Sequence, residues 1–134
     1  MDTLTPERRS ANMRRIRSKD TSPELLVRQL VYGMGYRYRL HVASLPGKPD
    51  LVFTRRKKII EVRGCFWHQH TGCIDSHIPK SRVGYWEPKL TRNKGRDAAN
   101  MRQLRSQGWI VLILWECELA DLRAIAKRIR SFLC

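Results

Sequence analysis

Apolar residues recur with a helical period in the segment 21–36. The apolar stripe consists of Leu25, Leu26, Leu30 and Val31. Ser22 and Pro23 stand where a helix would begin, because proline lacks the N–H that the first helical turn leaves unbonded. Gly33 and Gly35 interrupt the pattern, so we predict that the first confident helix ends there.

Three segments after this helix have the pattern of β-strands. Residues 36–42 alternate with a period of two, which is typical of a half-exposed strand. Residues 50–53 and 59–63 are apolar runs on either side of a short basic stretch. Their close spacing predicts two adjacent antiparallel strands.

The second half of the chain alternates helix and strand. We predict a helix over roughly 94–107 that ends at Gly108, and a last helix over about 119–132. Between them the run "WIVLILW" (109–115) is typical of a strand buried on both faces, and we expect its two tryptophans to lie in the core. The order β-β-β-α-β-α after an initial helix predicts an α/β fold with a central mixed sheet flanked by helices.

Charge indicates the class of partner. Lys and Arg total 27 against 12 Asp and Glu in 134 residues, a formal charge of +15, which favours nucleic acid as the partner. The alternative is a solvated basic surface on a ribosomal or chaperone-bound protein. The length suits one domain, 1–134, with residues 1–20 as a basic arm. No run approaches the roughly 20 apolar residues of a membrane span and no signal peptide is recognisable, so we expect a soluble intracellular protein.

Two carboxylates stand on the predicted hairpin. "PD" at 49–50, ten intervening residues and "EVR" at 61–63 form a pattern that resembles the PD-(D/E)xK signature of restriction-enzyme-like nucleases, with Arg63 where Lys is usual. Asp50, Glu61 and the carbonyl of Val62 would offer hard oxygen ligands to Mg²⁺. The alternative is an ordinary exposed hairpin with a Glu61–Arg63 pair. Glu24 has its own alternative role, beside the positive end of a helix dipole.

A second group of residues has the chemistry of a zinc site. Cys65, His70, Cys73 and Cys117 would form a closed Cys₃His set, although His68 or Cys134 could substitute on count alone. A disulfide is disfavoured in a reducing compartment, and free buried thiols that merely pack are the other alternative. A closed site has room for one of the two histidines. The other is free to accept a proton from water, or is simply solvated.

Aromatic residues flank these ligands. Phe66, Trp67 and Trp86, together with Met13 on the basic arm, either pack in a small core or wedge between base pairs. Packing is the commoner fate of such side chains, but the basic composition keeps the second interpretation open.

Four motifs together are similar to one known family. "NMRRIRSKDT", "SLPGKPDLVF", "GCFWHQH…C" and "GWIVLILWECEL" resemble the Vsr family of very-short-patch-repair DNA mismatch endonucleases, from about Ser10 to Leu119. The resemblance implies a restriction-endonuclease-like core with a structural Zn²⁺, and Mg²⁺-dependent nicking on the 5′ side of the thymine in a T:G mismatch. It also implies repair of deaminated 5-methylcytosine in double-stranded DNA, a functional link to a DNA cytosine methyltransferase, a monomer, and a bacterial cytoplasmic location at the nucleoid.

The resemblance assigns roles to individual residues. Asp50 and the Val62 carbonyl match the Mg²⁺ ligands, His68 matches the general base, and Glu24 matches an acid that supports the site through water. It implies Cys65, His70, Cys73 and Cys117 as zinc ligands, and Phe66, Trp67, Trp86 and Met13 as residues that insert at the mismatch. We further expect DNA contacts from Arg14, Lys48 and Arg63.

Three departures from the family pattern affect substrate preference. Glu61 stands where the family usually has an apolar residue, Val62 lacks a hydroxyl found in some relatives, and Cys73 is spaced one residue further from His70 than in some relatives. Glu61 would restore the general nuclease carboxylate and add a Mg²⁺ ligand. A restriction or defence nuclease that cuts matched or methylated DNA is therefore the alternative function. A zinc-braced DNA-binding module without catalysis is a third.

Overall fold

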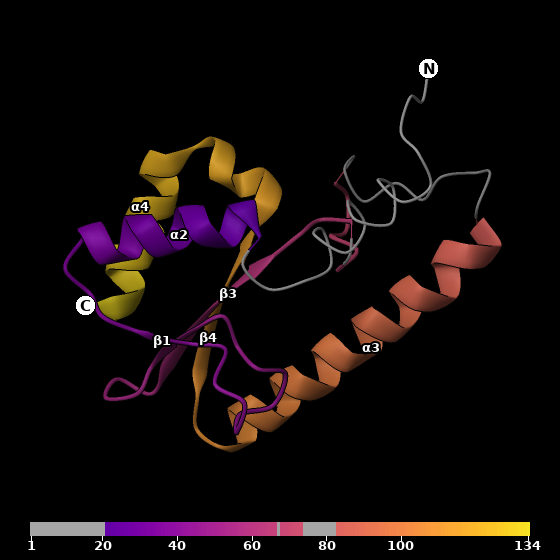
Figure 1. The fold of residues 1–134 in the computed structure, drawn as a ribbon, viewed down its shortest axis with the longest axis horizontal. Coiled ribbons are helices and arrows are strands. Elements are labelled where there is room, and N and C mark those ends of the chain that lie inside the picture. Colours follow the sequence, from indigo (N-terminus) through magenta and orange to yellow (C-terminus); the bar gives the residue numbers. More distant parts are fainter. Residues whose placement is uncertain (1–20, 67, 74–82) are drawn as a thin grey trace.

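A computed structural model describes residues 21–66, 68–73 and 83–134. The predicted basic arm 1–20 therefore lies outside the described residues. The elements, labelled as in Figure 1, are α2 (Ser22–Gly33), β1 (Arg39–Leu40), β2 (Leu51–Phe53), β3 (Lys58–Arg63), α3 (Val83–Ser106), β4 (Ile110–Trp115), the 3₁₀ helix η3 (Glu116–Ala120) and α4 (Leu122–Leu133). None of the helices in these ranges is long and apolar enough to cross a membrane.

The strands form a mixed four-stranded sheet in the order β1-β2-β3-β4. β2 pairs antiparallel with both β1 and β3, with Leu51 opposite Ile60. β4 pairs parallel with β3, with Leu112 opposite Ile60, and the long helix α3 connects these two strands. The mixed α/β sheet and the antiparallel hairpin predicted from the sequence are thus confirmed.

Helices cover both faces of the sheet (Figure 1). α2 and α4 lie together on one face, where their apolar stripes pack against alternate residues of the strands. This core comprises Val27, Val31, Leu51, Phe53, Ile60, Leu114, Leu119, Ile125, Ile129 and Leu133. The opposite face carries a smaller cluster of Val52, Ile59 and Leu104, through which the C-terminal part of α3 packs on the sheet. The period-two alternation of the strands is what allows one sheet to have two cores.

Two elements have other bounds than predicted. The helix predicted to begin at 94 begins at Val83 and contains Pro88, whose missing N–H costs the helix one backbone hydrogen bond. The strand predicted over 36–42 shrinks to Arg39–Leu40. The residues before this strand pack on the core instead, and the Tyr38 hydroxyl donates to the carbonyl of Arg28. The strand ends before His41, which has a φ of +45°.

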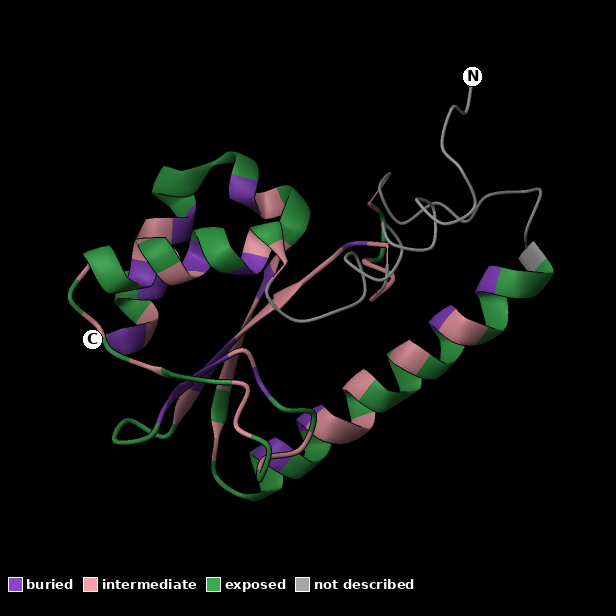
Figure 2. Cartoon of the chain, in the orientation of Figure 1, coloured by how far each residue is buried: buried purple, intermediate pink, exposed green. Residues whose placement is uncertain are grey.

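The expectation that 109–115 is buried on both faces was also wrong. β4 is an edge strand, and Ile110 at its beginning is 58% exposed, whereas Leu114 near its end is fully buried. Figure 2 shows α3 exposed along much of its length, consistent with a helix that contacts the sheet mainly near its C-terminal end.

Candidate active site and metal clusters

Four predicted metal ligands converge at the end of β3. The ligand atoms of Cys65, His70, Cys73 and Cys117 all lie within 4.8 Å of one another. His70 Nδ1 is 3.7 Å from Cys65 Sγ and 3.4 Å from Cys117 Sγ. A tetrahedral zinc ion separates sulfur and nitrogen ligands by roughly 3.5 Å, given its usual bond lengths. The cluster could therefore hold a metal ion without rearranging these side chains.

Backbone turns explain why His70 rather than His68 joins the cysteines. The loop after β3 folds back on itself, since the His68 N–H donates to the Gly64 carbonyl and the His70 N–H donates to the Cys65 carbonyl. Gly72 has a φ of +77°, a conformation that glycine adopts without strain, and this turn returns Cys73 to the cluster. Burial raises the pKa of the Cys65 thiol to about 12, so a bound cation is what would stabilise its thiolate.

Trp115 belongs to this cluster rather than to the core. Its ring stacks on the His70 imidazole, with centroids 4.1 Å apart and planes 6° from parallel. Trp115 is half-buried, because it ends the edge strand β4 directly before the segment that carries Cys117. The stacking fixes the plane of the imidazole. Trp109, the other tryptophan of the run, does pack against the smaller core.

A second cluster contains the carboxylates Glu24 and Asp50 together with His41. Potential ligand atoms of these three residues lie within 4.8 Å of one another. His41 Nε2 lies 3.0 Å from Glu24 Oε2 and 3.8 Å from Asp50 Oδ1. Arg28 also contacts the buried Glu24 from the next turn of α2. The sequence analysis did not predict His41. The register of the hairpin would have identified it, because the His41 N–H donates to the Asp50 carbonyl and so places the two residues side by side.

Asp50 has a strongly perturbed carboxyl group. Its Oδ2 accepts a 2.8 Å hydrogen bond from the N–H of Val62 on the neighbouring strand. Burial nevertheless raises the pKa of Asp50 to about 8. The nearby Glu24 also raises this pKa, whereas the hydrogen bond from Val62 lowers it. A buried carboxyl group facing a second carboxylate is the arrangement that a divalent cation would stabilise.

Glu61 lies outside this cluster of three. Its carboxylate accepts a 2.9 Å bond from Arg63, which is the face pair that the sequence offered as an alternative to metal binding. The negative charge of Glu61 still contributes to the raised pKa of Asp50, so the two carboxylates interact electrostatically. Arg63 in turn lies over the Trp115 ring, 5.9 Å from its centroid.

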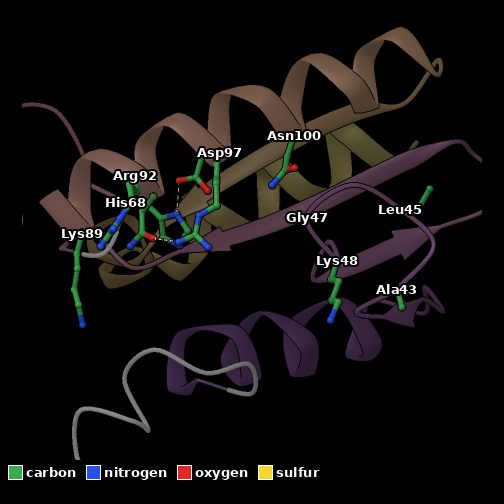
Figure 3. Close-up of a pocket in the computed structure, with 11 residues that line it drawn as sticks. Ala43, Leu45, Gly47, Lys48, His68, Lys89, Arg92, Asp97 and Asn100 are labelled. Atoms are coloured by element: carbon green, nitrogen blue, oxygen red, sulfur yellow. Dashed lines mark hydrogen bonds and ion pairs between the residues drawn. The ribbon is translucent and has the colours of Figure 1, made fainter.

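His68 faces a groove beside α3. Its Nδ1 is 2.5 Å from a carboxylate oxygen of Asp97, a residue of α3 that sequence reasoning missed (Figure 3). The feature of the sequence that could have identified Asp97 is that it is a lone acidic residue within the basic stretch "NKGRDAAN". The groove encloses about 1050 Å³ and is strongly basic. Its charged lining comprises Lys48, Lys89, Arg92, Arg96, His68 and Asp97.

The predicted inserting residues are only partly described. Met13, Arg14 and Trp67 lie outside the described residues. Trp86, near the start of α3, is 7% exposed, and its ring meets that of Phe66 edge to face at 5.2 Å. In this conformation the two rings pack on each other, which is the alternative that the sequence left open.

These features define a class of protein. A mixed α/β sheet carries two clusters of potential metal ligands, and a basic groove lies beside an imidazole paired with a carboxylate. This arrangement suits a metal-binding protein that acts on a polyanion.

Comparison with known proteins is more specific. A family model described as DNA mismatch endonuclease Vsr matches residues 1–73. The Type II nicking enzyme V.XorIIP of Xanthomonas oryzae pv. oryzae is 48% identical over 132 residues, 98% of this chain and 96% of that protein. The DNA mismatch endonuclease Vsr of Escherichia coli K12 is 37% identical over 131 residues, 94% of this chain and 83% of that protein. The chain belongs to the Vsr family and is an endonuclease that acts on DNA.

Proposed function

We propose that this protein nicks one strand of double-stranded DNA on the 5′ side of the thymine in a T:G mismatch, with Mg²⁺ as cofactor. The nick would begin repair of deaminated 5-methylcytosine, which links the protein functionally to a DNA cytosine methyltransferase. The observation that carries the proposal is the His68–Asp97 pair in a basic groove that is also lined by Lys48, two residues before Asp50 in the sequence. The relative named a mismatch endonuclease supports the choice of substrate.

The proposed chemistry assigns a proton acceptor to the chain itself. Because Asp97 faces Nδ1 of His68, that nitrogen would carry the proton, and Nε2 would be left free to accept one from the attacking water. Asp50 and the Val62 carbonyl would hold Mg²⁺, with Glu61 as a further ligand and Glu24 supporting the site through water. When bound, Mg²⁺ polarises a phosphate and lowers the pKa of a coordinated water.

The Cys65, His70, Cys73 and Cys117 cluster suits zinc by its ligand types and spacing. In this proposal zinc has a structural role. It would hold the loop between β3 and α3 in the conformation that presents His68 to the groove, since two of the ligands flank His68 in the sequence.

DNA would bind along the groove and be deformed at the mismatch. Lys48 and Arg63 would contact the duplex from the described part, and Arg14 from the arm 1–20. Insertion of Phe66, Trp67 and Trp86, with Met13 from the opposite groove, would separate Trp86 from its present contact with Phe66. We propose a monomeric, single nuclease domain (1–134) with a restriction-endonuclease-like core that associates with the nucleoid through DNA.

A nicking assay on labelled duplexes tests this proposal. Wild-type protein with Mg²⁺ should nick a T:G duplex and leave the paired duplex intact. Asp50→Ala and His68→Ala should abolish nicking while retaining the fold by circular dichroism. Equal cutting of both duplexes would contradict the mismatch proposal, and double-strand breaks in matched DNA would instead favour a restriction-type nuclease.

A further inference from the structure

We propose that His41 is a direct nitrogen ligand of the ion held at Asp50, so that this centre binds Mn²⁺ more tightly than Mg²⁺. The inference rests on the metal site of the proposed function and adds to it a ligand and a metal preference. It concerns the cluster of Glu24, His41 and Asp50 that the fold assembles from α2, the end of β1 and the start of β2.

The hairpin places His41 beside Asp50 by its register. Leu40 pairs with Leu51, and the His41 N–H then donates to the carbonyl of Asp50 at 3.3 Å. His41 adopts a φ of +45°, which is unfavourable for a residue with a side chain, and local strain of this kind persists where the surroundings fix it. The imidazole consequently points between the two carboxylates rather than into solvent, with 15% of the side chain exposed.

The distances fit ligands of one octahedral ion. Two ligand atoms about 2.1 Å from a shared ion lie about 3.0 Å apart in adjacent positions and up to about 4.2 Å apart in opposite ones. His41 Nε2 lies 3.8 Å from Asp50 Oδ1, within this range, and 3.0 Å from Glu24 Oε2, the oxygen that Arg28 also contacts. The other oxygen of Asp50 is occupied by the Val62 N–H, so Oδ1 is the atom that faces the imidazole.

The ligand types determine the metal preference. Mg²⁺ favours oxygen ligands and dehydrates reluctantly, whereas first-row transition ions accept imidazole nitrogen readily. Mn²⁺ combines this tolerance of nitrogen with a normal affinity for carboxylates and octahedral geometry. One nitrogen beside the Asp50 carboxylate, in a largely buried site, therefore favours Mn²⁺ over Mg²⁺.

A purely structural role for His41 makes a different prediction. If the imidazole only forms an ion pair with Glu24, its removal changes stability and affects both metals equally. If His41 is a ligand, its removal weakens Mn²⁺ binding selectively. The ratio of the two affinities thus separates the roles, and thermal unfolding of each variant shows whether the fold is retained.

The test measures Mn²⁺ and Mg²⁺ binding by calorimetry to the zinc-loaded full chain and its His41→Gln variant. We expect wild-type protein to bind Mn²⁺ at least about tenfold more tightly than Mg²⁺, and His41→Gln to lose most of that difference. His68→Gln is the matched control: it removes the other carboxylate-paired imidazole and should leave both metal affinities unchanged while abolishing nicking. An unchanged Mn²⁺/Mg²⁺ ratio in a folded His41→Gln variant would overturn the inference.

A spectroscopic measurement on wild-type protein gives a second readout. Pulsed electron paramagnetic resonance of bound Mn²⁺ should show coupling to an imidazole nitrogen, and this signal should disappear in His41→Gln. Bound Mn²⁺ without nitrogen coupling would overturn the inference but leave the proposed function standing. Failure of Asp50→Ala to reduce binding of either metal would instead contradict the metal site on which both proposals rest.

Discussion

At the residue scale, two acids with similar exposure perform different tasks because their neighbours differ. Asp50 is largely buried beside Glu24. Burial, and after it the charge of Glu24, raise its pKa to about 8, so a bound cation would replace its proton. Asp97 lies 2.5 Å from Nδ1 of His68, where a carboxylate orients the imidazole. Replacing each acid with its amide therefore has distinguishable consequences.

We predict that Asp50→Asn stabilises the protein when no magnesium is present. Asp50 has an ordinary pKa of 3.8 and a folded value of about 8, so between these pH values the folded state holds a proton that the unfolded state has lost. Stability from this group is complete below the lower value and is lost as pH rises through the higher one. The amide variant does not titrate.

Thermal unfolding in magnesium-free buffer from pH 4 to 8 checks this prediction. The variant should gain at least about 1 kcal/mol over wild type at pH 8, roughly 4 °C in Tm, and little at pH 4. A chelator is omitted so that the cysteine cluster keeps its ion. Parallel pH profiles for the two proteins would contradict the raised pKa.

We predict that Asp97→Asn slows nicking without weakening DNA binding. The amide would stabilise the opposite imidazole tautomer and place the proton on Nε2, where it blocks proton acceptance. The single-turnover rate on T:G DNA should fall by roughly 100-fold or more, with affinity changed less than about twofold. Asp121→Asn, at the start of α4 and away from the groove, is the control and should be neutral. An unchanged rate would remove Asp97 from the mechanism.

At the element scale, the loop between β3 and α3 depends on side chains that follow two neighbouring parallel strands at the same end of the sheet. Its ligands Cys65, His70 and Cys73 follow β3, whereas Cys117 follows the parallel strand β4. Metal binding would therefore tie the loop to a strand more than forty residues away, as the 3.4 Å contact between His70 and Cys117 indicates. Such a link stabilises both the loop and the edge of the sheet.

We predict one zinc ion per chain in wild-type protein and its loss in Cys117→Ser. The serine oxygen is a poor substitute for a thiolate, so the variant should lose at least about 2 kcal/mol of stability. Elemental analysis and denaturant unfolding measure the two effects. Cys134→Ser is the matched control, because Cys134 is exposed beside Tyr36 and should affect neither quantity. Retention of zinc by Cys117→Ser would exclude Cys117 as a ligand.

Sequence patterns predicted the elements better than their contacts. The helix 22–33 and the antiparallel hairpin follow from local periodicity, and ligand types indicated a Cys/His cluster. The choice of His70 over His68 came from the family resemblance. His41 and Asp97 were missed because hairpin register and the packing of α3 bring them to the site, and neither is visible in local sequence. The start of α3 at Val83 was missed, and Trp115 was misplaced because an apolar run does not reveal that its strand is at an edge.

At the scale of the whole molecule, charge and shape act together. The formal charge of +15 is distributed so that several Lys and Arg side chains line the groove beside α3, while α2 and α4 close the opposite face of the sheet. A polyanion in the groove would contact phosphate-binding residues and the His68–Asp97 pair at once. Long-range attraction then contributes to affinity and local chemistry contributes to cleavage.

We predict that DNA affinity falls steeply with salt and that Lys48→Ala reduces this dependence. Removing one phosphate contact should lower the slope of log K against log[salt] by about one, for matched and mismatched DNA alike. Fluorescence anisotropy over a salt series measures the slope. Arg123→Ala, at an exposed position of α4 that does not line the groove, serves as the control. A slope unaffected by Lys48→Ala would remove the groove from the binding surface.

The most direct test of the central claim is to map the cut at nucleotide resolution on a duplex that contains one T:G pair, with each strand labelled in turn. The account predicts a single Mg²⁺-dependent nick immediately 5′ of the mismatched thymine, and no cut in the guanine strand or in the same duplex with a T:A pair. Cleavage at the same position in the T:A duplex, or cleavage of both strands, would contradict it.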